Sequence, residues 1–305
     1  MSRPRSLLLT LDAFGTIFYP HPPVPEQYAS AAHNFGLPQT VITPERVQSA
    51  FKTVFKAQAL ARPNYGRADV IAGRYGGPRQ WWDEVIRGSF THILSESDPA
   101  NNAEGNIPDG LIRHLHQRFA SSQGYASFED IEPFFSWLRR VKGTGVGPFD
   151  RVVVGIVSNS DDRVPAVLKS LGLRVGDCRA DEGVSSMRLP GYEERTVPGS
   201  ESGEVNDVDL VVTSYEAGYE KPSPRIFEVT KRQAETLVRN DASVGDAGDW
   251  TCVHIGDDLK KDFWAAREAG WEGYFLPRGQ VDQDLEGVKT IESLLDLIPV
   301  LEGYK

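Results

Sequence analysis

Four short apolar runs in this sequence each end close to a polar side chain that can take part in chemistry. Those side chains are a carboxylate, a hydroxyl, an ammonium group and a second carboxylate: Asp12, Ser158, Lys221 and Asp257. The runs that precede them are residues 7–11, 152–157, 210–213 and 252–255. In an open parallel sheet the carboxyl ends of the strands meet at one edge, where such folds bind ligands. We therefore expect these side chains to converge on one site.

Two carboxylates that face each other need a cation or a raised pKa. At a separation of about 4 Å they repel by about 1 kcal/mol in water and by about 4 kcal/mol near a protein surface. Mg²⁺ accepts one or two carboxylates and keeps its other positions for water and substrate phosphate. The sequence therefore predicts a Mg²⁺ site that includes Asp12 and Asp257.

In this order, the motifs resemble those of the haloacid dehalogenase superfamily of hydrolases. The superfamily motifs are an Asp before Gly-Thr, a Ser or Thr, a Lys, and a Gly-Asp pair with another Asp nearby; Asp262 supplies the last. The resemblance covers residues 1–19 and about 126–305. It implies an α/β fold with the strand order five-four-one-two-three, and it implies the backbone carbonyl of Phe14 as a further metal ligand.

Charge suggests a role for each catalytic candidate. Asp12 would attack phosphorus and form an aspartyl-phosphate that water later hydrolyses. Lys221 would offset negative charge, and Ser158 would donate its hydroxyl to a phosphoryl oxygen. Asp262 is expected to orient Lys221 or a metal-bound water rather than to bind the ion.

The substrate-binding candidates follow Asp12 and Ser158 in the chain. Backbone N–H groups at Phe14, Gly15 and Thr16 would form an anion nest. The Thr16 hydroxyl is expected either to cap the turn or to hold the Asp12 carboxylate, and Asn159 is a further substrate-binding candidate. His254, within an apolar strand, is expected to be a core histidine with its hydrogen bonds satisfied, not a base.

Phe14 departs from the phosphatase pattern, because phosphatases of this superfamily usually carry a second aspartate there for acid-base catalysis. Such assistance is worth about 10²- to 10⁴-fold, so a phosphatase without it should be slow. The first motif instead resembles the 2-haloacid dehalogenases, which use the aspartate without metal, whereas Gly256-Asp257-Asp258 resembles the metal-binding form. A Mg²⁺-dependent phosphatase is favoured. A dehalogenase and a non-catalytic metal- or ligand-binding regulatory protein stay open.

Composition limits the partners. The chain has 305 residues, of which 40% are hydrophobic and 25% charged, as in globular proteins of one or two domains. A net charge of −10 argues against nucleic acid, and no run approaches the roughly 20 apolar residues of a membrane span. Cys178 and Cys252 lack the spacing of a disulfide framework or zinc site. We expect a small anionic substrate and an intracellular, cytoplasmic location, with the nucleus open; the oligomeric state stays undetermined.

Residues 20–125 are expected to form a helical cap inserted after the first strand. Apolar spacing predicts helices at 25–35, 44–60, 79–94 and 109–120. The stretches 63–66 and 79–82 resemble the eukaryotic branch called haloacid dehalogenase-like hydrolase domain-containing protein 3. The cap aromatics Tyr65, Trp81, Trp82 and Phe90 are expected to pack as anchors, and one of Arg67, Arg74 and Arg79 is a candidate for holding a substrate anion.

Residues 126–305 alternate between strand and helix patterns, which indicates a parallel sheet with crossover helices. The expected helices are 133–142, 161–171, 224–238, 262–269 and 291–301, and a fifth strand is expected at 273–276. The stretch 176–208 has eight acidic and three basic residues and few aliphatic ones. We expect it to be a mobile surface insertion whose deletion over 181–204 leaves the fold intact.

Overall fold

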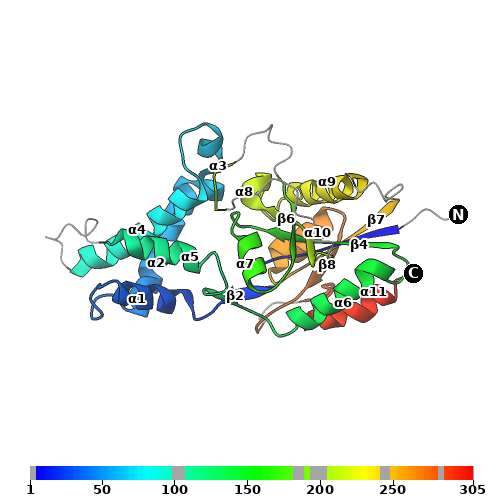
Figure 1. The fold of residues 1–305 in the computed structure, drawn as a ribbon, viewed down its shortest axis with the longest axis horizontal. Coiled ribbons are helices and arrows are strands. Elements are labelled where there is room, and N and C mark those ends of the chain that lie inside the picture. The colour runs from blue at the N-terminus through cyan, green and yellow to red at the C-terminus, as the bar shows by residue number, and fades with distance from the viewer. Residues whose placement is uncertain are drawn as a thin grey trace.

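A six-stranded parallel sheet forms the centre of the molecule, and the order of its strands is β5-β6-β4-β1-β7-β8. The computed structural model describes residues 5–97, 107–180, 189–192, 205–240, 248–280 and 285–304 (Figure 1). The strands are β1 (Arg5–Leu11), β4 (Arg151–Ser158), β5 (Val175–Cys178), β6 (Val208–Thr213), β7 (Asp249–Gly256) and β8 (Glu272–Phe275). The predicted α/β fold is therefore confirmed. The predicted strand order is also present, with β5 added at one edge.

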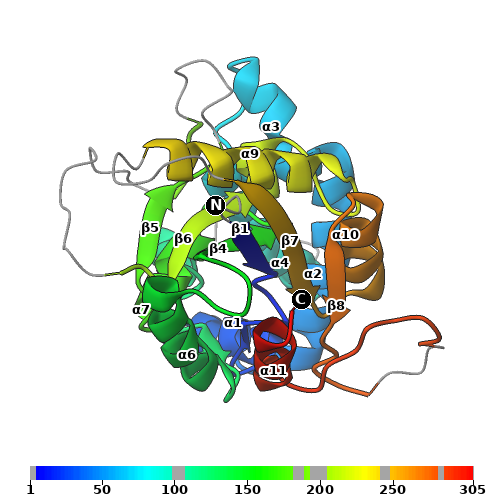
Figure 2. The same cartoon turned by 90° about the vertical axis from the view of Figure 1, so that its right-hand side faces the viewer.

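Both faces of the sheet are covered by helices (Figure 2). Along β1, Leu7, Leu9 and Leu11 pack into the cluster that includes α6, α7 and α11, whereas Leu8 packs with α9 and α10 on the other face. A strand buried on both faces is apolar throughout, which is why β1 reads as a continuous run. The elements are α6 (Ile131–Thr144), α7 (Val164–Ser170), α8 (Ser214–Ala217), α9 (Arg225–Asn240), the π-helix η3 (Leu259–Trp264), α10 (Ala265–Glu268), the 3₁₀ helix η4 (Leu294–Asp296) and α11 (Leu297–Glu302).

Five helices lie beyond the carboxyl end of β1, at the left of Figure 1. They are α1 (Val24–Asn34), α2 (Pro44–Ala61), α3 (Pro63–Ile71), α4 (Pro78–Ser97) and α5 (Asp109–Arg118). The chain enters and leaves this group through a small antiparallel sheet of β2 (Phe18–Pro20) and β3 (Tyr125–Ser127), in which Tyr19 pairs with Ala126. We propose that residues 20–125 act as a cap, since their expected boundaries lie on this pair of strands.

Three sequence predictions differ from the structure. The expected helix 262–269 is a π-helix from Leu259 followed by a short α-helix, and the last helix begins as a 3₁₀ turn at Leu294. The expected insertion 176–208 was wrong at its start, because residues up to Cys178 form edge strand β5. Within it, residues 181–188 and 193–204 lie outside the described residues.

Two further observations concern the composition. Among the helices that the described residues form, none combines the length and the apolar character that crossing a membrane requires. Cys252 is a buried free thiol, and Cys178 is half-buried.

Candidate active site

The loop after β1 brings Asp12 and Asp257 together. The Asp12 backbone N–H donates to the carbonyl of Ile255 on β7 at 2.9 Å, so the two neighbouring strands end level. Gly15 has φ +80°, and a Cβ atom there would collide with the Asp257 carboxylate. The Thr16 hydroxyl donates to Asp257 Oδ1 at 2.9 Å. The prediction for Thr16 is thus corrected, since its hydroxyl holds Asp257 and not Asp12.

Lys221 connects the ends of several strands. Its Nζ donates to Asp12 Oδ1 at 2.8 Å, to Asp262 Oδ1 at 2.6 Å and to the Val157 carbonyl at 2.7 Å. Since an ammonium group has three protons, these acceptors satisfy all of them, although the residue is only 3% exposed. Lys221 is therefore held as a fixed positive charge beside Asp12.

Asn159 holds the loop that carries this lysine. Its Nδ2 donates to the Lys221 carbonyl at 2.7 Å, and its Oδ1 accepts from the Lys221 N–H at 2.7 Å. These bonds fix the backbone on both sides of the Lys221 α-carbon. The predicted substrate contact of Asn159 stays a prediction. Ser158 is buried and, with Asn159, lines the same cavity as Asp12.

Two groups fix the Asp262 carboxylate in addition to its ion pair with Lys221. Its Oδ2 accepts from the Asp258 N–H at 2.9 Å, and its Oδ1 lies 3.2 Å from His254 Nε2. His254 Nδ1 in turn lies 2.9 Å from the Thr10 hydroxyl. His254 is therefore the satisfied core histidine that was predicted. Asp262 contacts Lys221 at 2.6 Å, and its role in orienting Lys221 or a metal-bound water stays a prediction.

Burial sets the charge balance of this group. Burial raises the pKa of Asp12 to about 6, against the opposing attraction of Lys221. Burial also raises the pKa of Asp257. For Asp262 burial acts in the same direction, but Lys221 and His254 hold its pKa below the usual range. Two raised carboxyl pKa values beside one lysine mean that the site is short of positive charge.

The chemistry of the donors fits a hard metal cation. Asp12, Asp257 and Asp262 each offer a carboxylate oxygen, and these three atoms lie within 4.8 Å of one another. Lys221 contacts Oδ1 of Asp12, and Thr16 contacts Oδ1 of Asp257. Oxygen ligands of this kind suit Mg²⁺ or Ca²⁺. We call Asp12, Asp257, Asp262 and Lys221 the acidic end of the site.

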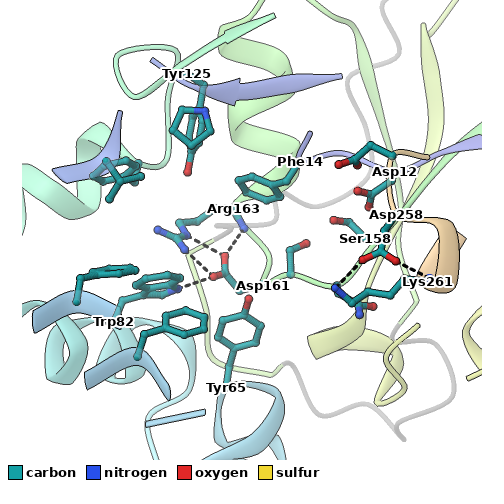
Figure 3. A pocket seen from close by; sticks show the side chains of 18 of the residues that line it. Asp12, Phe14, Tyr65, Trp82, Tyr125, Ser158, Asp161, Arg163, Asp258 and Lys261 are labelled. Carbon is teal, nitrogen blue, oxygen red and sulfur yellow. Dashed lines mark hydrogen bonds and ion pairs between the residues drawn. The ribbon is translucent and has the colours of Figure 1, made fainter. Parts of the chain in front are cut away.

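A cavity of about 410 Å³ extends from the acidic end towards the cap helices. The part of the cavity far from the acidic end is here called the aromatic chamber. Its lining includes Phe14, Phe55, Tyr65, Trp82, Phe119 and Tyr125. Figure 3 shows Phe14 between Asp12 on one side and Tyr125 and Arg163 on the other. Trp81 and Phe90 pack in the interior as predicted, whereas Tyr65 and Trp82 also line the cavity.

An ion pair in the cavity wall was missed from the sequence. Arg163 donates from Nε and Nη2 to the two carboxylate oxygens of Asp161 at 2.9 and 2.7 Å, and Trp82 Nε1 donates to Asp161 Oδ2 at 2.7 Å. The Arg163 guanidinium also lies 4.6 Å from the Trp82 ring centre. A signal existed, because Asp161 belongs to the polar cluster after the second apolar run.

The three cap arginines singled out from the sequence have other partners. Arg67 donates to the Glu216 carbonyl at 3.3 Å, Arg74 pairs with Asp69 at 2.7 Å, and Arg79 donates to the Gly191 carbonyl at 3.1 Å. Within the described part of the chain, none of them is among the residues that line the cavity.

Residues 189–192, from the expected surface insertion, lie between the cap helices and the sheet. The Pro190 carbonyl accepts from the Tyr215 hydroxyl at 2.6 Å, and the Tyr192 hydroxyl lies 2.5 Å from Nδ1 of His116 on α5. Pro190 and Tyr192 therefore make contacts with other elements, whereas the sequence predicted a mobile surface insertion.

Comparison with known proteins gives relatives that extend over nearly the whole chain, although no protein-family model matches it. An uncharacterised hydrolase of Schizosaccharomyces pombe is 27% identical over 269 residues, which are 88% of this chain and 89% of the relative. Haloacid dehalogenase-like hydrolase domain-containing protein 3 of Bos taurus is 26% identical over 300 residues, which are 97% of this chain and 93% of the relative.

Solved structures agree on the fold. A hydrolase of the haloacid dehalogenase (HAD) type from Bacillus subtilis, solved bound to magnesium, has a TM-score of 0.51 and 17% identity, with 98% of this chain and 99% of that chain covered. The defluorinating L-2-haloacid dehalogenase Rha0230 has a TM-score of 0.52 and 14% identity, with 98% and 96% covered. At 17% and 14% sequence identity, the likeness to these structures shows a shared arrangement of strands and helices.

Proposed function

Since the chain belongs to the haloacid dehalogenase superfamily of hydrolases, we propose that it is a Mg²⁺-dependent phosphatase acting on a small phosphate ester. The observation that carries this proposal is the position of Asp12 and Asp257 at the level ends of neighbouring strands, with Lys221 bonded to Asp12. A pair of carboxylates of this kind, with Asp12 buried and Asp257 half-buried, fits a divalent cation and a phosphoryl group better than an apolar ligand.

Each residue then has a defined task. An oxygen of Asp12 attacks phosphorus, the bond from phosphorus to the ester oxygen breaks, and the leaving group takes the electron pair and a proton from water. Water then hydrolyses the aspartyl-phosphate, which releases inorganic phosphate and restores Asp12. Lys221 and the Ser158 hydroxyl stabilise the negative phosphoryl oxygens. Mg²⁺, held by Asp12, Asp257 and the Phe14 carbonyl, would supply further positive charge.

The leaving group receives no help from a carboxyl at position 14. The Phe14 ring packs edge-on against Phe18 and Tyr125, with ring centres 4.7 and 5.6 Å apart. A hydrocarbon ring transfers no proton, and a missing general acid costs about 10²- to 10⁴-fold in rate. We therefore expect slow turnover of esters whose alcohols are strongly basic.

Phe14 also favours a second candidate, a metal-independent 2-haloacid dehalogenase, because halide leaves without a proton. Asp257 argues against it. A substrate carboxylate that approached Asp12 would meet a second negative charge, at a cost of about 1 to 4 kcal/mol per pair at about 4 Å without a cation. A binding protein that has lost turnover is the third candidate.

The test is phosphate release from a panel of phosphate esters, with Mg²⁺ and with chelator, beside halide release from 2-chloro acids. Asp12→Asn should abolish phosphate release, whereas Asp249→Asn, at the exposed opposite end of β7, should not. Undiminished turnover in chelator would contradict the metal's role. Halide release without metal would support the dehalogenase, and Mg²⁺ binding without turnover on either panel would support the binding protein.

A further inference from the structure

The aromatic chamber lies where a leaving group must go. In phosphoryl transfer the attacking and departing oxygens are roughly in line through phosphorus, so an ester attacked by Asp12 points its alcohol away from the acidic end. The cavity continues in that direction, past Phe14 (Figure 3). Its volume of about 410 Å³ is within the range of about 300 to 1,000 Å³ typical of sites for organic ligands. The space therefore accepts a group much larger than phosphate.

The charged groups that line the chamber cancel one another. Arg163 and Asp161 are both buried and form a two-point ion pair. Burial, together with the positive charge of Arg163, lowers the pKa of His116 to about 4, so that this side chain is neutral at pH 7. Lys261, which also lines the cavity, pairs with Asp258 at 3.0 Å. A second phosphate or a carboxylate on the leaving group would therefore find no unpaired cation among these groups. The chamber thus favours a neutral, apolar alcohol over a charged one.

Strained backbone helps to form the chamber. Tyr65 has φ 59° between Asn64 at 46° and Gly66 at 72°, and residues other than glycine seldom adopt such values. Asn64 Nδ2 donates to the Ser214 carbonyl at 2.7 Å, which holds this turn against the sheet domain. The turn places the Tyr65 ring in the chamber wall with Trp82, and the two ring centres lie 6.5 Å apart. Strain of this kind gathers at ligand-binding surfaces.

The missing acid points to the same class of alcohol. Phe14 stands where a proton donor would assist the leaving oxygen, and its ring is part of the chamber wall. A phenol departs as a stabilised anion and scarcely needs a proton, whereas an alkyl alcohol needs one. Phe14 contributes both to the aromatic wall and to the absence of the acid, and both features suit an aryl ester.

We infer that the substrate is a phosphate monoester of a neutral phenol, with its ring in the aromatic chamber; this inference rests on the proposed phosphatase function. Phosphoryl transfer to Asp12 then releases a phenol. The chamber selects the substrate by burying the ring, and the leaving group's own acidity replaces the general acid.

Three esters separate ring burial from leaving-group acidity. With Mg²⁺, kcat/KM should fall from phenyl phosphate to benzyl phosphate by about 10²-fold, because only the first leaves without a proton. It should fall again, by about tenfold, from benzyl phosphate to glycerol 3-phosphate, because only the ring gains from burial in the chamber.

A variant and a control lie on the same helix. Phe55 lines the chamber and is 37% exposed, whereas Leu60 is 83% exposed and lies outside the lining residues. Phe55→Ser should lower kcat/KM for benzyl phosphate about fivefold to tenfold more than kcat/KM for glycerol 3-phosphate. Leu60→Ser should change neither. Calorimetry with Mg²⁺ should show that the ratio of the affinity for benzylphosphonate to that for methylphosphonate falls by the same factor in Phe55→Ser and stays unchanged in Leu60→Ser.

The outcomes distinguish this inference from the proposed function. Equal kcat/KM for the three esters, or a phosphonate preference unchanged in Phe55→Ser, would overturn the aryl-ester inference while the phosphatase stands. Failure to turn over any of the esters, with Mg²⁺ bound, would overturn the proposed function and the inference with it.

Discussion

Replacing Phe14 by aspartate tests whether the missing general acid at position 14 limits phosphatase activity. The new carboxyl would stand two residues after Asp12, at the mouth of the aromatic chamber. Apolar surroundings and the nearby Asp12 charge would raise its pKa, so that a fraction stays protonated near neutral pH. A protonated carboxyl there could donate to the leaving oxygen.

The expected gain depends on the alcohol. For benzyl phosphate, Phe14→Asp should raise kcat by up to about 10²-fold, the low end for acid-base catalysis, whereas phenyl phosphate should gain little. The substitution also removes two edge-on ring pairs, with Phe18 and with Tyr125. At about 0.5 to 1.5 kcal/mol for each pair, the free energy of unfolding should fall by about 1 to 3 kcal/mol.

Phe14→Asn is the matched control, because it removes the same ring and adds a side chain of similar shape that carries no acidic proton. The assay is kcat for both esters at saturating Mg²⁺, with urea unfolding to confirm that each variant is folded. Equal rates for the Asp and Asn variants on benzyl phosphate would refute the reasoning. Another group would then supply the proton, or phosphoryl transfer would not be the native reaction.

Two further predictions concern buried charges. Lys221→Met leaves Asp12 and Asp262 without their shared cation. The variant should lower turnover by at least about 10²-fold and the free energy of unfolding by about 3 to 5 kcal/mol. The control Lys231→Met, on the exposed surface of α9, should change the free energy of unfolding by under about 0.5 kcal/mol. A smaller loss in urea unfolding would contradict the described network. His116 has a pKa of about 4 when folded and 6.5 as its ordinary value, so the unfolded chain binds more protons between these pH values. The free energy of unfolding should therefore fall by up to about 3 kcal/mol as the pH falls from 6.5 towards 4. In His116→Gln the free energy of unfolding should depend less steeply on pH. Equal slopes of the free energy of unfolding against pH in variant and wild type would contradict this prediction.

The sheet was predictable where its strands are buried on both faces. The strands β1, β4, β6 and β7 read as continuous apolar runs, because helices cover both sides of the sheet. Strand β5, with the sequence Val-Gly-Asp-Cys, lies at an edge and contains residues that disfavour strands, so it gave no pattern. The order of the strands came from the family resemblance, since local periodicity carries no information on which strands are neighbours.

The two ends of the site differ in how far the sequence determines them. A parallel sheet places the carboxyl ends of its strands at one edge, so the meeting of Asp12, Lys221 and Asp257 follows from strand assignment alone. The aromatic chamber depends instead on how the cap helices pack against the sheet. The hydrogen bond from Trp82 to Asp161 joins residues 79 positions apart, and helical periodicity shows which face of a helix is buried without showing what that face contacts. For that reason the sequence indicated Tyr65 and Trp82 only as packing residues and did not show that they line a cavity, whereas it did indicate the residue that would attack phosphorus.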